Sequence, residues 1–334
     1  MRPQEWPSGK GFVKIFTKSG EGAMRALPGL AMGHRPREPV VMNRRDFVRS
    51  AALSSLALTP AGSLLAALAP DNAYRKNIGI QLYTLRNALA KDPVGTLKAV
   101  AAAGYKQVEP YGFPNCQPLL DGAKDAGLAV NSTHFEWDSV IHPKDAGMSD
   151  FMKILDQAKK AGLSHLVIPY LADGDRGSLD GYKKIAENCN KAAEKARAAG
   201  IQLAYHNHAF EFQPKEGGKC GFDIFIADFS KDMKFEIDVF WIKVGGLEPA
   251  ALIEKLAGRV SQLHLKDLKA GLKLPEFGSL PEDAFKELGN GIIPMEPILA
   301  AAAKAGVVHC HVEQDHSPDP LASIKQSTVY LGKL

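Results

Sequence analysis

Eight short apolar runs recur between residues 78 and 313, and stretches with a helical pattern follow most of them. The runs predict β-strands at residues 78–83, 105–109, 129–134, 164–170, 201–206, 234–238, 260–266 and 308–313. Strands that alternate with helices form parallel sheets, because each helix carries the chain back to the start of the next strand. Eight such units in about 260 residues predict an α/β fold, the closed (β/α)8 or TIM barrel.

Six predicted helices end in the same way. They cover residues 94–104, 116–127, 149–162, 179–200, 249–258 and 295–306, and each finishes in an Ala-Gly pair. Glycine just past the last turn is a common helix stop, because it accepts the left-handed backbone conformation. The longest break in the pattern, residues 269–290, is predicted to lie over the mouth of the barrel, where long loops shape access to a site.

Polar residues collect at the ends of the predicted strands. Most of the runs end in or beside a residue that can bind a metal or transfer a proton, and these include Glu109, His134, His206, Asp238, His264, Lys266 and Glu313. The carboxyl ends of the strands converge on one mouth of a (β/α)8 barrel. The sequence therefore predicts an active site at that mouth.

Charge is distributed unevenly along the chain. Residues 1–69 hold ten Lys/Arg and four Asp/Glu, which leaves 31 of the 41 basic and 33 of the 37 acidic residues for the remainder. From residue 70 onward the protein is slightly acidic, although the whole chain has a formal net charge of +4. Because a nucleic-acid-binding domain shows the opposite balance, no nucleic-acid partner is expected. Residues 77–334 contain no linker or change in composition, and they predict a single catalytic barrel domain.

The positive charge near the N-terminus belongs to a segment with the pattern of an export signal. An Asn-Arg-Arg-Asp-Phe motif at residues 43–47 precedes a moderately apolar run that ends in Ala-Leu-Ala at residues 67–69. Residues 42–69 thus resemble a twin-arginine signal and predict a periplasmic or secreted protein with no stable membrane span after signal removal. The alternative, a membrane anchor, is disfavoured by Pro60 and Gly62. Residues 1–41 lack periodicity and are interpreted as a disordered or wrongly assigned extension ahead of a start at Met42.

Six motifs stand at the predicted strands. They are IGIQLYTLR at the first strand, GYKQVEPYGF at the second, LAYHNHAFEF at the fifth, FEIDVFWIKVGG at the sixth, QLHLKDLK at the seventh and ELGNGIIPMEPILAAAAKAGVVHCHVEQD leading into the eighth. Together they resemble the xylose isomerase-like TIM barrels, the sugar phosphate isomerase/epimerase superfamily, over residues 77–334. The resemblance implies an isomerase or epimerase that acts on a sugar with one divalent metal at the barrel mouth.

The resemblance also implies a ligand set for that metal. Family members take ligands after the fifth to eighth strands, and the last three positions are matched here by Asp238, His264 and Glu313. The fifth-strand position departs from the family, because His206 stands where many relatives have glutamate in a Glu-Asn-His motif. We expect His206 to replace that glutamate. His208 is the alternative, since it lies two residues further along the same face of the strand.

The chemistry of these side chains supports a metal site independently. Two imidazoles and two carboxylates give a mixed nitrogen and oxygen site of charge −2, which suits Mn²⁺, Co²⁺, Fe²⁺ or Zn²⁺, with Mg²⁺ as a further candidate, better than Ca²⁺. A metal that contacts a ketone oxygen and the adjacent hydroxyl stabilises an enediolate. Glu313 is the expected base that takes the proton. Each residue also has a structural alternative, such as Asp238 capping a loop or helix.

Further residues at the mouth are predicted to act on the substrate. We assign substrate contacts to Glu109, His134, Asn207, His208 and Trp241, and catalytic roles to Glu313, His206 and Lys266. Lys266 would neutralise an enediolate oxygen or bond a hydroxyl, with an ion pair to Asp267 or Glu313 as its structural alternative. Trp241 would stack on a sugar ring or pack in the core. His165, His309 and His311 alternate with apolar residues and are interpreted as structural.

Three functions agree with this pattern. The first is a metal-dependent isomerase or epimerase that acts on an unphosphorylated sugar or keto-sugar. Family epimerases use two opposed carboxylates, and His206 replaces one of them. A reaction with one base therefore fits the sequence better than epimerisation. Such a reaction is either isomerisation or elimination by a lyase or dehydratase from a 3-keto-glycoside or keto-inositol. The second is a non-catalytic periplasmic carbohydrate-binding barrel. The third is an endonuclease of the related zinc-barrel type, which the acidic domain disfavours. Relatives often form homo-oligomers, but the sequence identifies no interface.

Overall fold

The computed structural model describes residues 73–334, apart from the side chains of Ala73 and Arg75. The predicted barrel domain, residues 77–334, lies entirely within this range. The predicted export signal at residues 42–69 and the extension at residues 1–41 lie outside the described residues.

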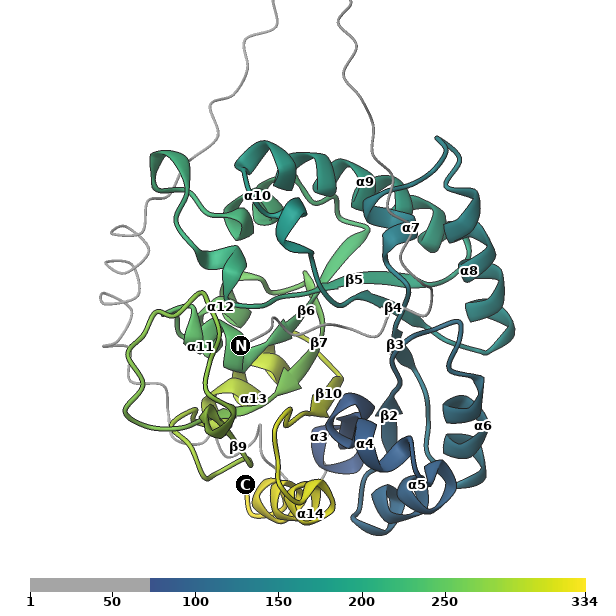
Figure 1. Cartoon of the computed structure of the whole chain (residues 1–334), viewed down its shortest axis with the longest axis vertical. Helices are drawn as coiled ribbons and strands as arrows, with labels where there is room; N and C mark the ends of the chain where they lie inside the picture. The colour runs from purple at the N-terminus through teal and green to yellow at the C-terminus, as the bar shows by residue number, and fades with distance from the viewer. Residues whose placement is uncertain (1–72) are drawn as a thin grey trace, which may run out of the picture.

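Eight parallel strands form a nearly closed barrel (Figure 1). They are β1 (Gly79–Gln81), β2 (Gln107–Glu109), β3 (Ser132–His134), β4 (His165–Ile168), β5 (Gln202–His206), β6 (Met233–Asp238), β7 (Val260–Leu265) and β10 (His309–Val312). Neighbouring strands pair in the order β2-β1-β10-β7-β6-β5-β4-β3. The two outermost strands meet through isolated bridges from Gln107 to Ala129 and from Phe113 to Phe135. The predicted (β/α)8 barrel is confirmed, and every strand falls within one residue of its predicted segment.

Helices connect the strands, and six of them lie where the sequence pattern predicts. These are α5 (Pro93–Ala102), α6 (Gln117–Asp125), α8 (Ser149–Lys160), α9 (Leu179–Ala198), α12 (Pro249–Lys255) and α13 (Met295–Lys304). A glycine with positive φ follows each of them, as Gly200 does after α9 with a φ of 80°. At that backbone conformation a side chain would be strained, so glycine ends the helix and directs the chain into the next strand.

The sequence pattern missed the shorter helices and the last one. The structure adds α3 (Ala73–Lys76), α4 (Arg86–Leu89), α7 (Asp138–Ile141), α10 (Gly221–Asp228), α11 (Val239–Val244) and α14 (Pro320–Leu331). It also contains 3-10 turns η1 (Leu82–Leu85), η2 (Asp173–Asp175), η3 (Phe210–Phe212), η4 (Glu216–Gly218) and η5 (Glu282–Ala284). Most of these elements are too short to show a 3.6-residue period, and α11 is apolar at nearly every position, so periodicity does not reveal them.

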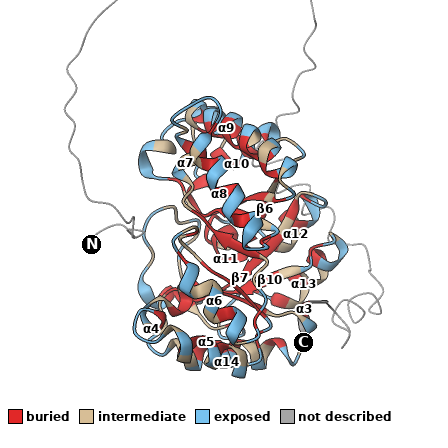
Figure 2. Cartoon of the chain, turned by 90° about the vertical axis from the view of Figure 1, so that its right-hand side faces the viewer, coloured by how far each residue is buried: buried red, intermediate tan, exposed pale blue. Residues whose placement is uncertain are grey.

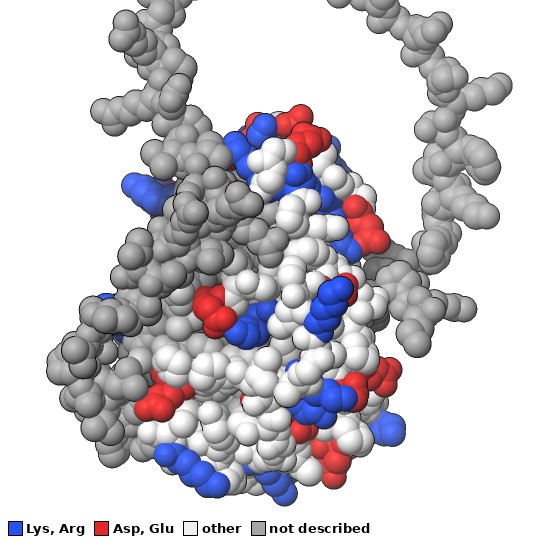
Figure 3. Space-filling view, turned by 90° about the vertical axis from the view of Figure 1, so that its left-hand side faces the viewer, with Lys and Arg blue, Asp and Glu red and all other residues white. Residues whose placement is uncertain are grey.

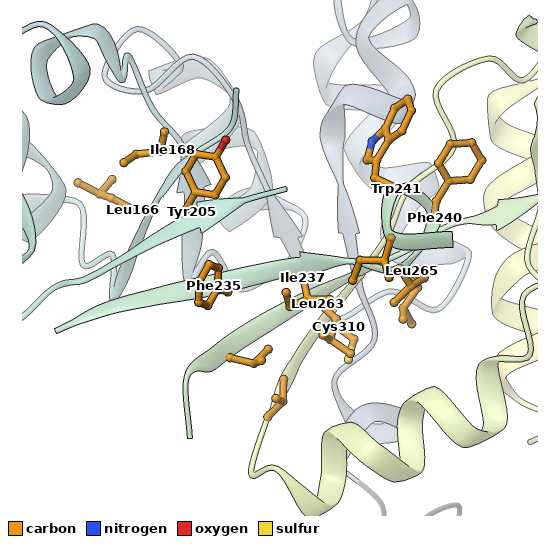
Figure 4. Packing of buried hydrophobic residues seen from close by; sticks show 14 of the residues in the cluster. Leu166, Ile168, Tyr205, Phe235, Ile237, Phe240, Trp241, Leu263, Leu265 and Cys310 are labelled. Carbon is orange, nitrogen blue, oxygen red and sulfur yellow. The ribbon is translucent and has the colours of Figure 1, made fainter. Parts of the chain in front are cut away.

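Side chains alternate along the strands between two environments. Phe235 and Ile237 of β6 and Leu263 of β7 belong to the apolar layer between the strands and the helices, shown at close range in Figure 4. Glu236, which lies between Phe235 and Ile237, and His264, which follows Leu263, contact each other inside the barrel. Figure 2 shows the same division in the whole molecule, with buried strands at the centre and exposed residues on the outer faces of the helices. Because the side-chain period of a strand is two residues, alternate residues at the strand ends face the mouth.

The long segment at residues 269–290 lies beside the mouth of the barrel. At its ends β8 (Asp267–Leu268) pairs antiparallel with β9 (Phe285–Lys286). Phe285 packs on Phe240 and Trp241 of α11, with ring centroids 4.6 and 5.9 Å apart. None of residues 269–290 lines the mouth pocket. Through Phe285 the segment therefore packs against α11, whose Trp241 lines the pocket, and its place over the mouth stays a prediction.

The surface of the described part of the chain mixes charges of both signs. On the face in Figure 3, Lys and Arg side chains stand among Asp and Glu with no continuous field of one sign. Among residues 73–334, no helix combines the length and the apolar character that crossing a membrane requires.

Candidate metal centre

Four side chains from neighbouring strands converge at the carboxyl end of the barrel. They are His206 at the end of β5, Asp238 at the end of β6, His264 in β7 and Glu313 just after β10. Each offers one ligand atom, and the four atoms lie within 4.8 Å of one another. The strand order β10-β7-β6-β5 brings these distant positions together, and the register pairs Asp238 directly with His264. All four residues of the predicted ligand set thus lie in one buried cluster.

Asp238 combines the structural role and the functional role that its sequence position allowed. Its Oδ1 accepts hydrogen bonds from the backbone N–H groups of Phe240 (2.9 Å) and Trp241 (3.3 Å) and so caps α11. Its Oδ2 faces the cluster, 3.2 Å from Nε2 of His206 and 3.2 Å from Nζ of Lys266. The cap fixes the side-chain rotamer, and this directs the second oxygen toward the site.

His264 lies at the centre of the cluster and uses both ring nitrogens. Nδ1 is 2.8 Å from Oε2 of Glu313 and 4.0 Å from Oδ2 of Asp238, toward the mouth. Nε2 points deeper into the barrel, where it lies 2.7 Å from Oε2 of Glu109. Burial alone would lower the pKa of His264, but Glu236, Glu313 and the hydrogen bond to Glu109 raise it well above the ordinary value. A metal that binds Nδ1 must therefore displace a proton.

Lys266 is almost fully buried among three carboxylates. Its Nζ lies 2.9 Å from Glu313, 3.1 Å from Asp315 and 3.2 Å from Asp238. Burial would lower the pKa of the Lys266 ammonium, but these acids raise it well above the ordinary value, so the group stays charged. The expected ion pair with Glu313 is present. Asp267, the other expected partner, binds backbone amides instead.

The charge states of the remaining ligands follow from their neighbours. Burial would raise the pKa of Glu313, but Lys266 and His264 hold it well below the ordinary value, so Glu313 is an ionised carboxylate. Burial lowers the pKa of His206 despite its contact with Asp238, so its imidazole is neutral at pH 7. A neutral imidazole and ionised carboxylates are the forms that bind a metal. The cluster therefore fits a divalent metal of the kind that accepts mixed nitrogen and oxygen ligands.

His206 and His208 differ in position. His206 belongs to the four-residue cluster, whereas His208 is outside it. The His208 ring stacks on Phe210, with centroids 5.2 Å apart and planes 6° apart, and lies 5.2 Å from the Trp241 ring. Burial, His206 and Lys266 hold the pKa of His208 well below its ordinary value. The geometry favours His206 as the ligand and places His208 in an aromatic wall beside the site.

A small pocket, with a volume of about 20 Å³, adjoins the cluster. Its lining residues are Tyr83, His134, His206, His208, Trp241, Lys266, Glu313 and Asp315. Four buried atoms of these residues have no hydrogen-bond partner among the described residues: His206 Nδ1, His208 Nδ1, Trp241 Nε1 and Asp315 Oδ1. Buried polar atoms are nearly always paired in proteins. Water or a polar ligand is the expected partner of these atoms.

Two residues assigned to substrate contacts do not line this pocket. Glu109 is fully buried below the cluster and contacts Gln81, Ser132, Gln262 and His264. Asn207 uses its side-chain amide on the backbone of Asp238, where it accepts from the N–H (3.0 Å) and donates to the carbonyl (3.3 Å). Asn207 therefore holds the end of β6 in register with the end of β5.

Three residues of the site were not predicted from the sequence. Asp315 lines the pocket beside Lys266, and burial raises its pKa to about 7 against the opposing effect of that lysine. Glu236 and Gln262 lie in the barrel interior under the cluster. The alternation of the strands offered a signal, because Glu236 lies two residues before Asp238, Gln262 two before His264 and Asp315 two after Glu313.

Comparison with known proteins agrees with this architecture. The family model of the xylose isomerase-like TIM barrel matches residues 97–332. Inosose dehydratase of Clostridium beijerinckii is 23% identical over 223 residues, which cover 60% of this chain and 74% of that protein.

Two solved structures resemble the fold. A sugar phosphate isomerase/epimerase from Parabacteroides distasonis superposes with a TM-score of 0.65 at 24% identity, over 78% of this chain and 98% of the other. The IOLI protein with a bound zinc atom gives a TM-score of 0.58 at 15% identity, over 76% and 97% of the two chains. At these identities the structures show a shared fold only. The match of the family model over most of the chain shows that this protein belongs to the xylose isomerase-like TIM barrel family.

Proposed function

We propose that the protein is a metal-dependent enzyme that isomerises or epimerises an unphosphorylated sugar or keto-sugar through an enediolate. The observation that carries this proposal is the buried cluster of His206, Asp238, His264 and Glu313. Two of its members, His206 and Glu313, also line the adjacent pocket. The zinc atom in the IOLI protein, a relative by fold, supports the metal assignment. The sugar phosphate isomerase/epimerase with the same fold supports a sugar as the class of substrate.

The residues divide the chemistry between them. When bound, a divalent metal at the four ligands would act as a Lewis acid on a carbonyl oxygen and the adjacent hydroxyl of the sugar. Glu313, ionised at the edge of the pocket, would accept the proton from the carbon between them. Lys266, a buried ammonium beside Glu313, would stabilise negative charge that develops on a substrate oxygen. His208 and Trp241 would pack against the sugar ring and bond its hydroxyls with their unpaired nitrogens.

Elimination is the second candidate reaction. A lyase or dehydratase would use the same proton abstraction and then expel a group from a 3-keto-glycoside or keto-inositol. The similarity to inosose dehydratase favours this candidate. His206 also favours elimination, because it replaces the fifth-strand carboxylate that family epimerases use as a second base. If no turnover is found, the alternative is a carbohydrate-binding protein without catalysis.

Proton NMR in D₂O separates these candidates. Metal-loaded protein is incubated with a panel of ketoses, 3-keto-glucose, 3-keto-glycosides and keto-inositols. Deuterium that enters the carbon next to the carbonyl, with a new sugar as product, supports isomerisation or epimerisation. Release of an aglycone or water supports elimination. Tight binding with no exchange for any compound would replace the enzyme proposal with the binding-protein proposal.

We also propose that the protein is exported to the periplasm through the twin-arginine route. The support is the sequence motif at residues 43–47 and the apolar run that follows it. Substitution of both Arg44 and Arg45 with Lys is expected to keep the full-length protein in the cytoplasm, and fractionation with immunoblotting measures this. Export of the double variant at the wild-type level would contradict the proposal.

A further inference from the structure

Two glutamates lie buried beneath the metal centre. Glu109 of β2 and Glu236 of β6 are both 0% exposed, inside the barrel and on the side of His264 away from the mouth. The interior of a (β/α)8 barrel is usually filled by branched apolar side chains. A buried carboxylate costs several kcal/mol unless hydrogen bonds compensate. A pair of them in this position therefore indicates a specific task.

The surroundings of Glu109 require an ionised carboxylate. Every hydrogen-bond partner of its two oxygens can donate, and these partners are Gln81 Nε2 (2.9 Å), Gln262 Nε2 (2.9 Å), Ser132 Oγ and His264 Nε2 (2.7 Å). A carboxylate accepts from all four, whereas an amide would place its own N–H₂ group against one of these donors.

Glu236 completes the support from the opposite side of the barrel. Its Oε1 is 3.2 Å from Nε2 of His264, and its Oε2 is 2.9 Å from Nε2 of His134. Nε2 of His134 is also 3.4 Å from Glu109. The two imidazole rings stack with centroids 5.3 Å apart and planes 15° apart. Gln262 donates to both glutamates and holds the pair together.

This arrangement decides which nitrogen of His264 is available to a metal. A neutral imidazole that donates from Nε2–H leaves Nδ1 unprotonated. Nδ1 is the nitrogen that faces Glu313 and Asp238. Carboxylates that accept from the outer nitrogen of a metal-binding histidine fix its tautomer and ring orientation and raise its basicity.

We infer that Glu109, assisted by Glu236, is a positioning residue that orients His264 and directs its Nδ1 to the metal centre. The inference rests on the metal site of the proposed function and deepens it. It assigns Glu109 to the support of a ligand, in place of the substrate contact expected from its position at a strand end. It also accounts for two buried charges that the proposed reaction does not use.

A second metal is the competing interpretation of the same residues. Ligand atoms of Glu109, Glu236, His264 and His311 also lie within 4.8 Å of one another. Neither ring nitrogen of His311 has a hydrogen-bond partner among the described residues. A metal here would compete with donors that already bind the carboxylates, which are Gln81 and Gln262 at Glu109 and Gln262 and His134 at Glu236. The satisfied hydrogen bonds therefore favour positioning, and metal stoichiometry distinguishes the two interpretations.

The experiment measures metal binding without substrate. Zn²⁺ affinity and stoichiometry are determined by competition with a chromogenic chelator for the wild type, Glu109→Gln and Glu236→Gln, and the visible spectrum of each Co²⁺-loaded protein is recorded. We expect one metal per wild-type chain and a 10- to 100-fold weaker affinity for Glu109→Gln, about the loss typical of an outer-shell partner. We expect a smaller loss for Glu236→Gln, whose contact to His264 is longer, and an altered Co²⁺ spectrum for Glu109→Gln.

Glu211→Gln is the matched control. Glu211 is also a fully buried carboxylate, but it binds Tyr205 and the backbone of His208 and has no contact with His264. Its substitution should leave the Zn²⁺ affinity unchanged. A Glu109→Gln protein with wild-type affinity and an unchanged Co²⁺ spectrum would reduce Glu109 to a structural role. Two metals per wild-type chain, with one lost in Glu109→Gln, would show a second metal site. The metal-binding assay contains no substrate. A lack of sugar turnover in a separate assay would therefore contradict the proposed function without contradicting the role of Glu109.

Discussion

Single residues at the mouth carry two tasks at once, as Asp238 shows by capping α11 with one oxygen and facing the cluster with the other. Glu313 is similar, because it is a ligand of the proposed metal and the proposed base. Its carboxylate lies 2.9 Å from Lys266 and 2.8 Å from His264. These contacts keep it ionised and hold it in one place, which is what a proton acceptor requires.

Glu313→Gln tests the assignment of the base. The variant keeps the size of the side chain and one oxygen ligand, but it cannot accept a proton, so turnover at saturating metal should fall by about 10²- to 10⁴-fold. Deuterium exchange at the substrate carbon should fall equally, since both depend on the same proton transfer. Exchange at the wild-type rate would remove Glu313 as the base.

A pair of alanine variants tests the fifth-strand ligand. His206 contributes an atom to the four-residue cluster, whereas His208 lies in the aromatic wall. His206→Ala should weaken Zn²⁺ binding by more than about tenfold, because loss of an outer-shell partner already costs that much. His208→Ala should change Zn²⁺ affinity little. The reverse ranking, measured by chelator competition, would make His208 the ligand.

At the scale of elements, loops beside the barrel are held by buried carboxylates. Asp267 of β8 accepts four backbone N–H groups, those of Leu268 (2.8 Å), Gly289 (2.9 Å), Gly291 (2.9 Å) and Ile293 (2.9 Å). Its carboxylate thereby folds residues 287–293 against β8. Gly291 allows the approach, because a side chain there would collide with Asp267.

Asp267→Asn should destabilise the fold. An amide keeps one acceptor oxygen and turns a donor toward the other backbone N–H groups, so about two charge-assisted hydrogen bonds are lost. At about 1.5 kcal/mol or more each, the free energy of unfolding should fall by about 3 kcal/mol, measured by urea denaturation. Asp283→Asn, which removes an exposed carboxylate paired with Lys269, serves as the control and should change little. Equal effects of the two substitutions would contradict this role of Asp267.

Glu211, in the connection after β5, should make the free energy of unfolding depend on pH. Glu211 is fully buried and binds Tyr205 Oη and the His208 N–H, and burial raises its pKa to about 7. The folded protein therefore keeps this proton to higher pH than the unfolded chain, in which the glutamate has its ordinary pKa of 4.5. The stability from this group is complete below about pH 4.5 and is lost as the pH rises through about 7.

Glu211→Gln removes this dependence. Glutamine can accept from the His208 N–H and donate to the Tyr205 hydroxyl without acquiring charge. Relative to the wild type, the variant should gain stability between pH 5 and pH 8, by up to about 3 kcal/mol at the upper end. Unfolding free energies measured across this range test the point. A constant difference between the two proteins would mean that Glu211 is not the group responsible.

At the scale of the whole molecule, the barrel closes around a charged interior. Four carboxylates in or directly after three strands, β2, β6 and β10, share few cations, chiefly Lys266 and His264. A divalent metal would add positive charge where ligands from β5, β6, β7 and β10 meet. Metal binding should therefore couple to the stability of the barrel and not only to activity.

Removal of metal should lower the melting temperature. A metal present at about 100 times its Kd contributes about 2.7 kcal/mol to the folded state, so a chelator should lower Tm by several degrees and added Zn²⁺ should restore it. The shift should be much smaller in His206→Ala, which has lost one ligand. A chelator effect of equal size in both proteins would indicate that the stabilising metal binds elsewhere.

Much of the architecture follows from local patterns. The short apolar runs of the strands and the Ala-Gly helix ends are local, so the eight strands, six helices and the barrel could be predicted. Position at the strand ends placed His206, Asp238, His264 and Glu313 at the mouth, and the family resemblance supplied their roles. Short apolar segments such as α11 escaped prediction because a period cannot appear in six residues.

The sequence by itself determined which residues face the interior of this barrel, because alternation along a strand is a local property. Only the tertiary structure decided their depth and their partners. Register between strands sets Asp238 beside His264 at the mouth, and closure of the barrel brings Glu109 of β2 under His264 of β7. Depth matters physically, because a glutamate at the mouth could contact a substrate. Glu109 lies one layer below, where it is buried and supports the metal ligand His264.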